Sequence, residues 1–289
     1  MELTAEKQGT AQIERVFRLQ QKRSVLLRQE TVSARKERLK RLSTWLFANR
    51  ERVKKAVHQD FKKPLLEVDT TELYPIIAEI RHVLSHLDEW AEPSKIDATL
   101  SYLGTRSEIR YEPKGVCLII APWNFPFNLC IGPLISCLAA GNTAILKPSE
   151  LTPATSKLVA EMIPEIFSED EVAVIEGGIE EAAHLTSLPF DHIFFTGSPA
   201  VGKIIMKAAA ENLTSVTLEL GGKSPTIIDA TANLKDAAKR IAFGKFMNNG
   251  QTCIAPDYVM IEEKVRDEFL AALKHQVTAI FGENGTITE

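Results

Sequence analysis

The pattern of apolar residues changes along the chain near residue 115. Before this point, apolar residues recur at intervals of three and four, which is typical of amphipathic helices. This spacing predicts helices over residues 13–29, 32–60 and 73–90. The second segment contains a basic stretch at 35–55. We interpret this stretch as a solvated helix face, not a nucleic-acid or membrane surface, because apolar residues keep the helical spacing through it: Leu39, Leu42, Leu46 and Val53.

After residue 115, short apolar runs alternate with segments of helical length. This alternation predicts βαβ units, in which a parallel sheet carries helices on its faces, so the expected fold class is α/β. Ligands of such sheets bind beyond the carboxyl ends of the strands, and the loops there are the places to search for a site. Before this region, Pro93 ends the helical pattern and residues 99–111 are expected to form a strand or hairpin. The expected strands are 116–121, 144–146, 172–176, 192–195, 216–220 and 226–228, and the expected helices between them are 129–140, 153–167, 199–212 and 234–248.

Composition and charge narrow the class of protein. The chain has 289 residues, 45% hydrophobic and 25% charged, which is ordinary globular usage. Its net charge of −4 gives no bias toward nucleic acid or anionic membranes. The most apolar region, 116–140, is interrupted by proline, asparagine and glycine, whereas a membrane helix needs about 20 unbroken apolar residues. With no signal-peptide pattern at the N-terminus, we expect a cytoplasmic protein.

The four cysteines divide into two groups. Cys117, Cys130 and Cys137 have apolar neighbours, and we predict that they are buried packing residues. Cys253 follows polar residues and Gly250, a setting that suits a thiol meeting a substrate, although an ordinary loop cysteine is the alternative. No CxxC pair is present, which argues against a structural zinc site and a disulfide framework.

Glu219 is a second candidate for chemistry. It stands at the end of an apolar strand, where a carboxylate is costly unless it is paired or functional. Burial would raise its pKa toward neutrality, which suits a general base. The alternative is a structural ion pair, for example with Lys223. Gly221 and Gly222 directly after it suggest a close approach by a ligand or by another chain segment.

Other polar residues follow the first expected strands of the sheet. The amide of Asn124 could donate to a developing oxyanion, or Asn124 could simply form a turn between prolines. Lys147 and Glu150 could hold a ribose diol, since one donates and the other accepts. The alternative for this pair is a solvated loop before a helix capped by Thr152.

A glycine-containing turn and a histidine pair complete the candidates. Gly197, Ser198 and Gly202 occupy an expected strand-to-helix turn, which suits phosphate binding or is an ordinary tight turn with proline in the first helical turn. His82 and His86 are four residues apart, as metal ligands on a helix can be, but no Glu stands beside the first His as it does in zinc proteases. We therefore interpret both histidines as ordinary helix residues and expect no metal site.

Five motifs occur along the chain in this order: PWNFP (122–126), KPSE (147–150), FTGS (195–198), ELGGK (219–223) and GQTC (250–253). Together they resemble the aldehyde dehydrogenase superfamily. The extension CIAPDY at 253–258 is similar to the class 3 branch, which includes fatty, aromatic and coniferyl-type aldehyde dehydrogenases. The resemblance implies a Rossmann-like sheet and the NAD(P)-dependent oxidation of an aldehyde to a carboxylic acid (EC 1.2.1.-), through a cysteine thiohemiacetal and a thioester.

The resemblance also implies roles for individual residues. Cys253 would be the nucleophile, Glu219 the general base, and the Asn124 side chain with the Cys253 N–H the oxyanion hole. Lys147 and Glu150 would hold the adenosine ribose of the cofactor. The remaining positions implied to bind the cofactor are Gly197, Ser198 and Gly202 along its phosphates, together with Pro122, Trp123 and Leu220. NAD is expected, with NADP possible, because a carboxylate at 150 repels a 2′-phosphate. No metal is required.

The implied domains are an NAD(P)-binding domain at 1–91 and 113–216, a hairpin of the oligomerisation region at 92–112, and an incomplete catalytic domain at 217–289. The complete enzyme would form a homodimer that acts on a small-molecule aldehyde. Family members continue well past the position where this chain ends, so the resemblance implies a truncated product or fragment with little activity. The alternatives are a relative that reduces acyl-CoA or acyl-phosphate, and a non-catalytic cofactor-binding remnant.

Overall fold

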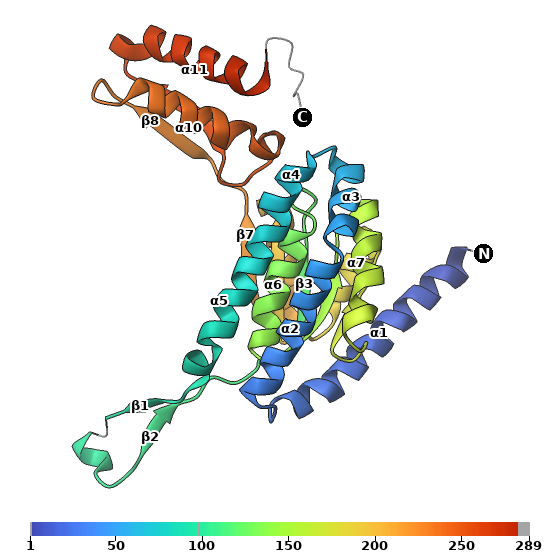
Figure 1. Ribbon diagram of the computed structural model, residues 1–289. Helices are drawn as coiled ribbons and strands as arrows, with labels where there is room; N and C mark the ends of the chain where they lie inside the picture. Colours follow the sequence, from blue (N-terminus) through green and yellow to red (C-terminus); the bar gives the residue numbers. More distant parts are fainter. Residues whose placement is uncertain (1, 98, 283–289) are drawn as a thin grey trace. The chain divides into compact units, whose positions relative to one another are not determined.

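The computed structural model describes residues 2–97 and 99–282. The chain divides into two compact units, Met1–Glu219 and Leu220–Glu289, and each is described by itself (Figure 1). The boundary lies within the ELGGK motif. No helix of the described residues is both long and apolar enough to cross a bilayer.

The first unit begins with the predicted helical region. The predicted helix over 32–60 is divided at Asn49, whose side-chain amide donates to the Trp45 carbonyl oxygen at 3.0 Å and so competes with the main-chain pattern. The apolar residues that keep the helical spacing through the basic stretch, Leu39, Leu42, Leu46 and Val53, are buried, whereas Phe47 is exposed. The elements are α1 (Glu2–Leu27), α2 (Val32–Ala48), α3 (Arg50–Phe61), α4 (Leu65–Val68), the π-helical turn η1 (Asp69–Leu73) and α5 (Tyr74–Ala91).

A five-stranded sheet forms the centre of this unit, with strand order β5-β4-β3-β6-β7. β3 pairs in parallel with β4 and β6, and β4 pairs in parallel with β5. Every residue of β3 and β4 is buried, which explains the apolar runs at 116–120 and 144–146 in these strands. The predicted α/β class is confirmed. The strands are β3 (Val116–Ile120), β4 (Thr143–Lys147), β5 (Val172–Val174), β6 (His192–Gly197) and β7 (Ser215–Leu220).

The strand order reverses between β3 and β6. Because crossovers between parallel strands are right-handed, α6 and α7 cover one face of the sheet and α9 covers the other. Helices α2, α3 and α5 pack outside α6 and α7, while α1 packs against β3, β4 and α8. The short helix α8 was not expected from the apolar pattern. The bounds are α6 (Asn128–Ala139), α7 (Pro153–Ile166), α8 (Ile179–Ser187) and α9 (Pro199–Glu211).

A hairpin follows α5, as predicted, but it begins before residue 99. Strand β1 (Ser94–Ile96) pairs antiparallel with β2 (Ser107–Ile109), and the short 3-10 turn η2 (Leu100–Tyr102) lies between them. Figure 1 shows the hairpin extending away from the sheet. Large apolar side chains at its tip are exposed, including Leu100 and Leu103. Exposed apolar patches of this kind are typical of association surfaces.

The second unit contains another βαβ arrangement. Strands β8 (Ser224–Ile228) and β9 (Pro256–Ile261) pair in parallel. Between them lie α10 (Leu234–Phe246) and the 3-10 turn η3 (Met247–Gly250), and the turn η4 (Glu263–Val265) and helix α11 (Arg266–Phe281) follow. β9 and α11 were not predicted, and residues 283–289 of the expected catalytic segment lie outside the described residues. The core of the unit is formed by Ile228, Ala238, Ile241 and Phe269.

Candidate active site

The sheet brings three of the candidate loops to one edge. Ile120 at the end of β3 is in register with Lys147 of β4 and with Phe195 of β6. The loops that begin after these positions therefore leave the sheet side by side. They contain Asn124, Glu150 and Ser198. This edge also flanks the position where the strand order reverses, which is where open α/β sheets bind their ligands.

Two of the helices that begin at this edge are capped by carboxylates from the N-terminal helical layer. The N-terminus of α6 meets Glu72, which accepts hydrogen bonds from the N–H groups of Phe127 at 3.2 Å and Asn128 at 2.8 Å. The N-terminus of α7 meets Asp60, which accepts from the N–H of Ala154 at 3.0 Å and of Thr155 at 2.7 Å.

The Thr152 side chain does not cap α7, contrary to the alternative interpretation of this segment. Its hydroxyl donates to the carbonyl oxygen of Ser149 at 3.3 Å, and the carboxylate of Asp60 takes the capping position. The physical reason is that an ionised carboxylate is a stronger acceptor for helix N–H groups than a hydroxyl is. Asp60 comes from α3, so it was not visible in the local sequence around α7.

The N-terminus of α9 differs from the other two. Its N-cap is its own Ser198, whose hydroxyl accepts from the Val201 N–H at 3.3 Å, and Pro199 occupies the first turn as predicted. Ser198 and the first turn are exposed, and no carboxylate of the described residues caps this helix. The partial positive charge of this helix end is therefore not neutralised by a carboxylate of the described residues. Such an end can bind an anion such as a phosphate group. Gly202 is buried on the same helix.

Gly197 is fixed by packing. A Cβ placed there would lie 2.4 Å from the Phe195 ring, so any side chain at this position would displace that ring. The glycine therefore lets the main chain between β6 and α9 pass close to the sheet. The glycine is thus accounted for by packing within the protein, which agrees with an ordinary tight turn.

Lys147 and Glu150 form a donor and acceptor pair. Lys147 is buried, and its Nζ donates to Glu150 at 3.1 Å, to the Gly177 carbonyl oxygen at 2.8 Å and to the Pro148 carbonyl oxygen at 3.2 Å. Partial burial raises the pKa of Glu150, but a main-chain hydrogen bond and Lys147 outweigh it, so the pKa lies below its usual value. Glu150 is thus an exposed, ionised acceptor beside an ammonium whose three protons are donated to Glu150 and to the Pro148 and Gly177 carbonyl oxygens.

The loop that carries Asn124 is anchored by aromatic residues. Trp123 stacks on Phe61 with ring centroids 5.9 Å apart and an interplanar angle of 19°. Phe125 is buried, while Asn124 is half-buried and Trp123 is exposed. The loop therefore presents the Asn124 and Trp123 side chains while its other residues are held in the core.

In the second unit, Cys253 is the exposed cysteine of the four, and the other three are buried, as predicted. Burial raises the pKa of Cys130 to about 12. A hydrogen bond with Cys117 and burial raise the pKa of Cys137 well above its usual value. Cys130 and Cys137 therefore stay protonated near neutral pH, which makes them poor nucleophiles. Cys253 is the thiol that a substrate can reach.

The segment before Cys253 has a specific main-chain shape. Asn248, Asn249 and Gly250 have φ of 52°, 54° and 75°, a left-handed run that asparagine and glycine tolerate best. The expected close approach at the glycine pair is also found. A Cβ at Gly222 would lie 2.8 Å from the Cys253 carbonyl oxygen, whereas a Cβ at Gly221 would meet nothing within 4 Å.

The structure corrects the expectation for Glu219. Glu219 is exposed, because it lies on β7, which is an edge strand of the sheet. The alternative ion pair with Lys223 is also wrong, since Lys223 pairs with Asp257 at 2.8 Å. The burial expected for Glu219 is therefore not found.

The histidine pair lies on the surface of α5. The His82 and His86 rings are 4.3 Å apart, and His86 stacks with Trp90 at 5.6 Å. Within the described residues, no group of three potential metal ligands occurs. His82 is exposed and His86 is half-buried, and the two form an aromatic cluster with Trp90 on this helix.

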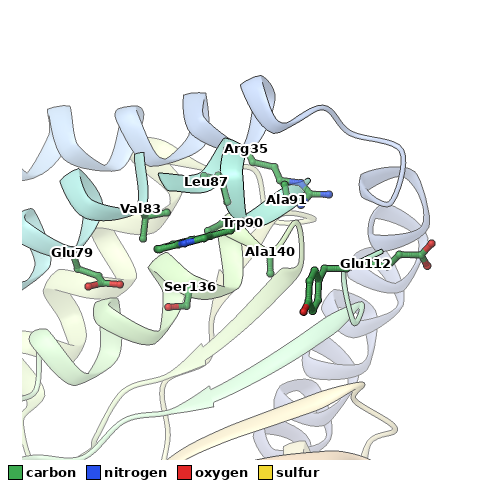
Figure 2. Close-up of a pocket in the computed structure, with 11 residues that line it drawn as sticks. Arg35, Glu79, Val83, Leu87, Trp90, Ala91, Glu112, Ser136 and Ala140 are labelled. Carbon is green, nitrogen blue, oxygen red and sulfur yellow. The ribbon is translucent and has the colours of Figure 1, made fainter. Parts of the chain in front are cut away.

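A pocket of about 250 Å³ lies among α2, α5 and α6, and Figure 2 shows Leu87, Trp90 and Ala140 around it. It is bounded by the C-terminal turn of α6 and by residues that precede β3. It therefore lies toward the amino ends of the strands, and none of the candidate residues lines it.

Sequence reasoning missed Glu72, Lys63 and Asp60. A signal for Glu72 was present, because it precedes Ile76 and Ile80 at intervals of four and so falls on the buried face of that helical segment. Asp60 carried no comparable signal.

The comparisons with known proteins agree with this arrangement. The model of the aldehyde dehydrogenase family matches residues 3–287. Aldehyde dehydrogenase family 3 member A2 of Macaca fascicularis is 45% identical over 229 residues, which is 79% of this chain and 47% of that protein. The chain spans 47% to 62% of the length of the curated relatives that it matches.

Two solved structures share the fold. The substrate-bound structure of Staphylococcus aureus AldH has 44% identity and a TM-score of 0.92, and the match covers 94% of this chain and 59% of that one. The Mycobacterium tuberculosis aldehyde dehydrogenase complexed with NAD+ has 30% identity and a TM-score of 0.80, and the match covers 88% and 52%. With the family motifs in order and matches at this level, the chain belongs to the aldehyde dehydrogenase family, with relatives in its class 3 branch.

Proposed function

We propose that the protein oxidises an aldehyde to a carboxylic acid with NAD(P)+ as the oxidant. The observation that carries the proposal is the exposure of Cys253 within the GQTC motif, while the other three cysteines are buried. An exposed thiol preceded by a sharp main-chain turn can meet a carbonyl carbon, whereas a packed thiol cannot. The chain spans about half the length of its relatives. That the whole protein oxidises aldehydes is therefore also a proposal.

The first unit supports binding of the cofactor. We propose that its phosphates lie at the N-terminus of α9, near Gly197, Ser198 and Gly202, where the helix end is left for an anion. Lys147 and Glu150 hold the adenosine ribose. A relative of known structure, the Mycobacterium tuberculosis enzyme, is complexed with NAD+. The exposed carboxylate of Glu150 disfavours a 2′-phosphate, so NAD is the preferred form.

Further contacts with the cofactor are assigned to Pro122, Trp123 and Leu220 by the same resemblance. Trp123 supports this assignment, since it is exposed beside the candidate edge of the sheet. The hairpin at 92–112 is proposed to contribute to a homodimer, and its exposed apolar tip supports that role. The segments 1–91 and 113–216 are then the cofactor-binding domain, and 217–289 belongs to the catalytic domain.

The proposed chemistry uses three side chains. The Cys253 thiolate attacks the carbonyl carbon and forms a carbon–sulfur bond, while the Asn124 amide donates to the oxygen that becomes negative. NAD(P)+, held by the residues proposed above, would supply the acceptor for the hydride that leaves this carbon, so that a thioester results. Glu219 then takes a proton from water, whose oxygen attacks the thioester carbon. The carbon–sulfur bond breaks, and the acid and the Cys253 thiolate are released.

The test follows NADH and acid formation by the purified 289-residue chain with an aldehyde and NAD+. Cys253→Ala should abolish both products while NAD+ binding survives. Cys117→Ala, which removes a buried thiol, should retain turnover. Glu219→Gln should release a burst of NADH and then stall, because the thioester is not hydrolysed. Unchanged turnover in Cys253→Ala would refute the nucleophile, and NADH oxidation driven by an acyl-CoA or acyl-phosphate would favour the reductase alternative.

A further inference from the structure

A buried ion pair lies directly behind the loop that carries Asn124. Lys63 Nζ is 2.7 Å from Oε1 of Glu72, and the two side chains are 1% and 0% exposed. Glu72 belongs to η1, a π-helical turn inserted between α4 and α5. Such turns are rare and are frequent at functional sites. The proposed chemistry assigns neither residue a role.

The two carboxylate oxygens of Glu72 accept hydrogen bonds from different parts of the chain. Oε1 receives Lys63, and Oε2 receives the N–H groups of Phe127 and Asn128 at the start of α6. A further hydrogen bond joins α6 to η1, in which the Asn128 side chain donates to the Thr71 carbonyl oxygen at 3.0 Å. The first turn of α6 is therefore held by η1 through its main chain and through a side chain.

Lys63 contacts the other side of the same loop. Its ammonium lies 4.6 Å from the centre of the Phe125 ring and 5.3 Å from that of Phe61. Phe61 in turn stacks on Trp123. Both sequence neighbours of Asn124 are thus connected to this buried pair, one directly and one through Phe61. At the beginning of the loop, the Ala121 N–H donates to the Lys147 carbonyl oxygen at 3.0 Å.

The geometry points to Glu72 and Lys63 as positioning residues that set the Asn124 amide for the oxyanion. This inference rests on the proposed function, in which Asn124 donates to the substrate oxygen. The loop at 121–128 is fixed by β3 at one end and by α6 at the other. The position of its central residue therefore depends on how firmly both ends are held. An oxyanion donor loses its effect when it moves by a fraction of its hydrogen-bond length.

A purely structural role would have different consequences. In that case the pair would stabilise the whole unit without any specific effect on the loop at 121–128. Asp69 offers a matched control, because it lies in the same π-helical turn but directs its carboxylate to Arg50 at 2.6 Å and Lys54 at 3.4 Å, both of which belong to α3. Asp69→Asn removes a charge from η1 but leaves the hydrogen bonds of Glu72 and Thr71 with the start of α6 in place.

The test compares Glu72→Gln with Asp69→Asn in two measurements. In the first, hydrogen–deuterium exchange of the peptide at 121–128 should be at least about tenfold faster in Glu72→Gln and unchanged in Asp69→Asn, since lost hydrogen bonds free the amides. In the second, kcat should fall about 10- to 100-fold in Glu72→Gln, with little change in the KM for NAD+, because the transition-state contact is lost and cofactor contacts remain.

The two measurements separate this inference from the proposed function. If the unaltered chain does not oxidise aldehydes, the proposed function fails, while the exchange measurement still decides whether Glu72 holds the loop. Should Glu72→Gln not fold, Asn128→Ala removes the contact to Thr71 and should accelerate exchange of the same peptide to a smaller extent. Exchange at 121–128 that matches the unaltered chain, or a kcat that Glu72→Gln does not change in an active enzyme, would overturn the inference.

Discussion

Lys63 and Glu72 neutralise each other in a place where water does not reach, with 2.7 Å between the ammonium and the carboxylate. Burial raises the pKa of Glu72, and Lys63 with the two amides of α6 offsets part of that effect. Such a pair adds little net stability compared with apolar residues, but the loss of one partner leaves a buried charge. The relationship is therefore asymmetric, and removal of one member should be worse than removal of both.

We predict that Lys63→Met lowers the free energy of unfolding by about 3–5 kcal/mol at neutral pH, as measured by urea denaturation. Without Lys63, the pKa of Glu72 in the folded state rises further above its unfolded value. A raised carboxyl pKa gives stability that is present below the unfolded pKa and lost as the pH rises, so the deficit should shrink toward acidic pH. The double variant Lys63→Met with Glu72→Met should recover part of the loss. A double variant that is less stable than Lys63→Met would contradict this account.

The exposure of the cysteines leads to a prediction that does not depend on catalysis. Iodoacetamide should modify one thiol in the native protein, at Cys253, and all four thiols after denaturation. The buried thiols are out of reach of the reagent. For Cys130, a pKa raised to about 12 also keeps the thiol protonated and therefore unreactive. Mass spectrometry of the modified peptides checks the assignment. Native-state modification that persists in Cys253→Ala would show that a thiol described as buried is accessible.

Much of the fold could be predicted because its signals are local. The apolar runs of β3 and β4 follow from burial on both faces of a parallel sheet, and the separation of Cys253 from the other cysteines followed from neighbouring residues. β9 was missed because it begins with Pro256 and has exposed positions, so it lacks a continuous apolar run.

The parts of the site that escaped prediction depend on contacts between distant positions. Glu72 meets Asn128 56 residues further along the chain, and Asp60 meets Thr155 across 95 residues. A local pattern can show that Glu72 lies on an apolar face, but it cannot name the helix end that the carboxylate caps. Glu219 was misjudged for a related reason, since its exposure follows from the place of β7 at the sheet edge and not from its apolar neighbours.

The glycine pair at 221 and 222 provides a matched comparison. Gly222→Ala would place a Cβ 2.8 Å from the Cys253 carbonyl oxygen, so the main chain of the cysteine segment has to move. We expect kcat to fall by about 10- to 100-fold, because a small displacement of a reacting group is costly. Gly221→Ala meets nothing within 4 Å and serves as the control. The rate of Cys253 alkylation gives a second measurement, and equal behaviour of the two variants would contradict the proposed contact.

His192 leads to a prediction on pH. Its imidazole lies on β6, where Nδ1 is 2.8 Å from the Ser215 hydroxyl and Nε2 is 3.1 Å from the Thr217 hydroxyl. Burial, followed by the charge of Lys114, lowers the pKa of His192 below its usual 6.5, and the hydrogen bond with Ser215 opposes this only in part. The folded protein therefore holds His192 neutral at a pH where the unfolded chain takes up a proton.

The sign of the effect on stability follows from this difference. A depressed folded-state pKa gives stability that is fully present above the unfolded pKa and is lost as the pH falls through the folded-state value. We predict that the free energy of unfolding of the unaltered chain, measured relative to His192→Gln, decreases between about pH 7.5 and about pH 5.5. Urea denaturation of both proteins across this range provides the measurement. A difference that stays constant or grows as the pH falls would show that burial and the charge of Lys114 do not keep His192 neutral in the folded protein.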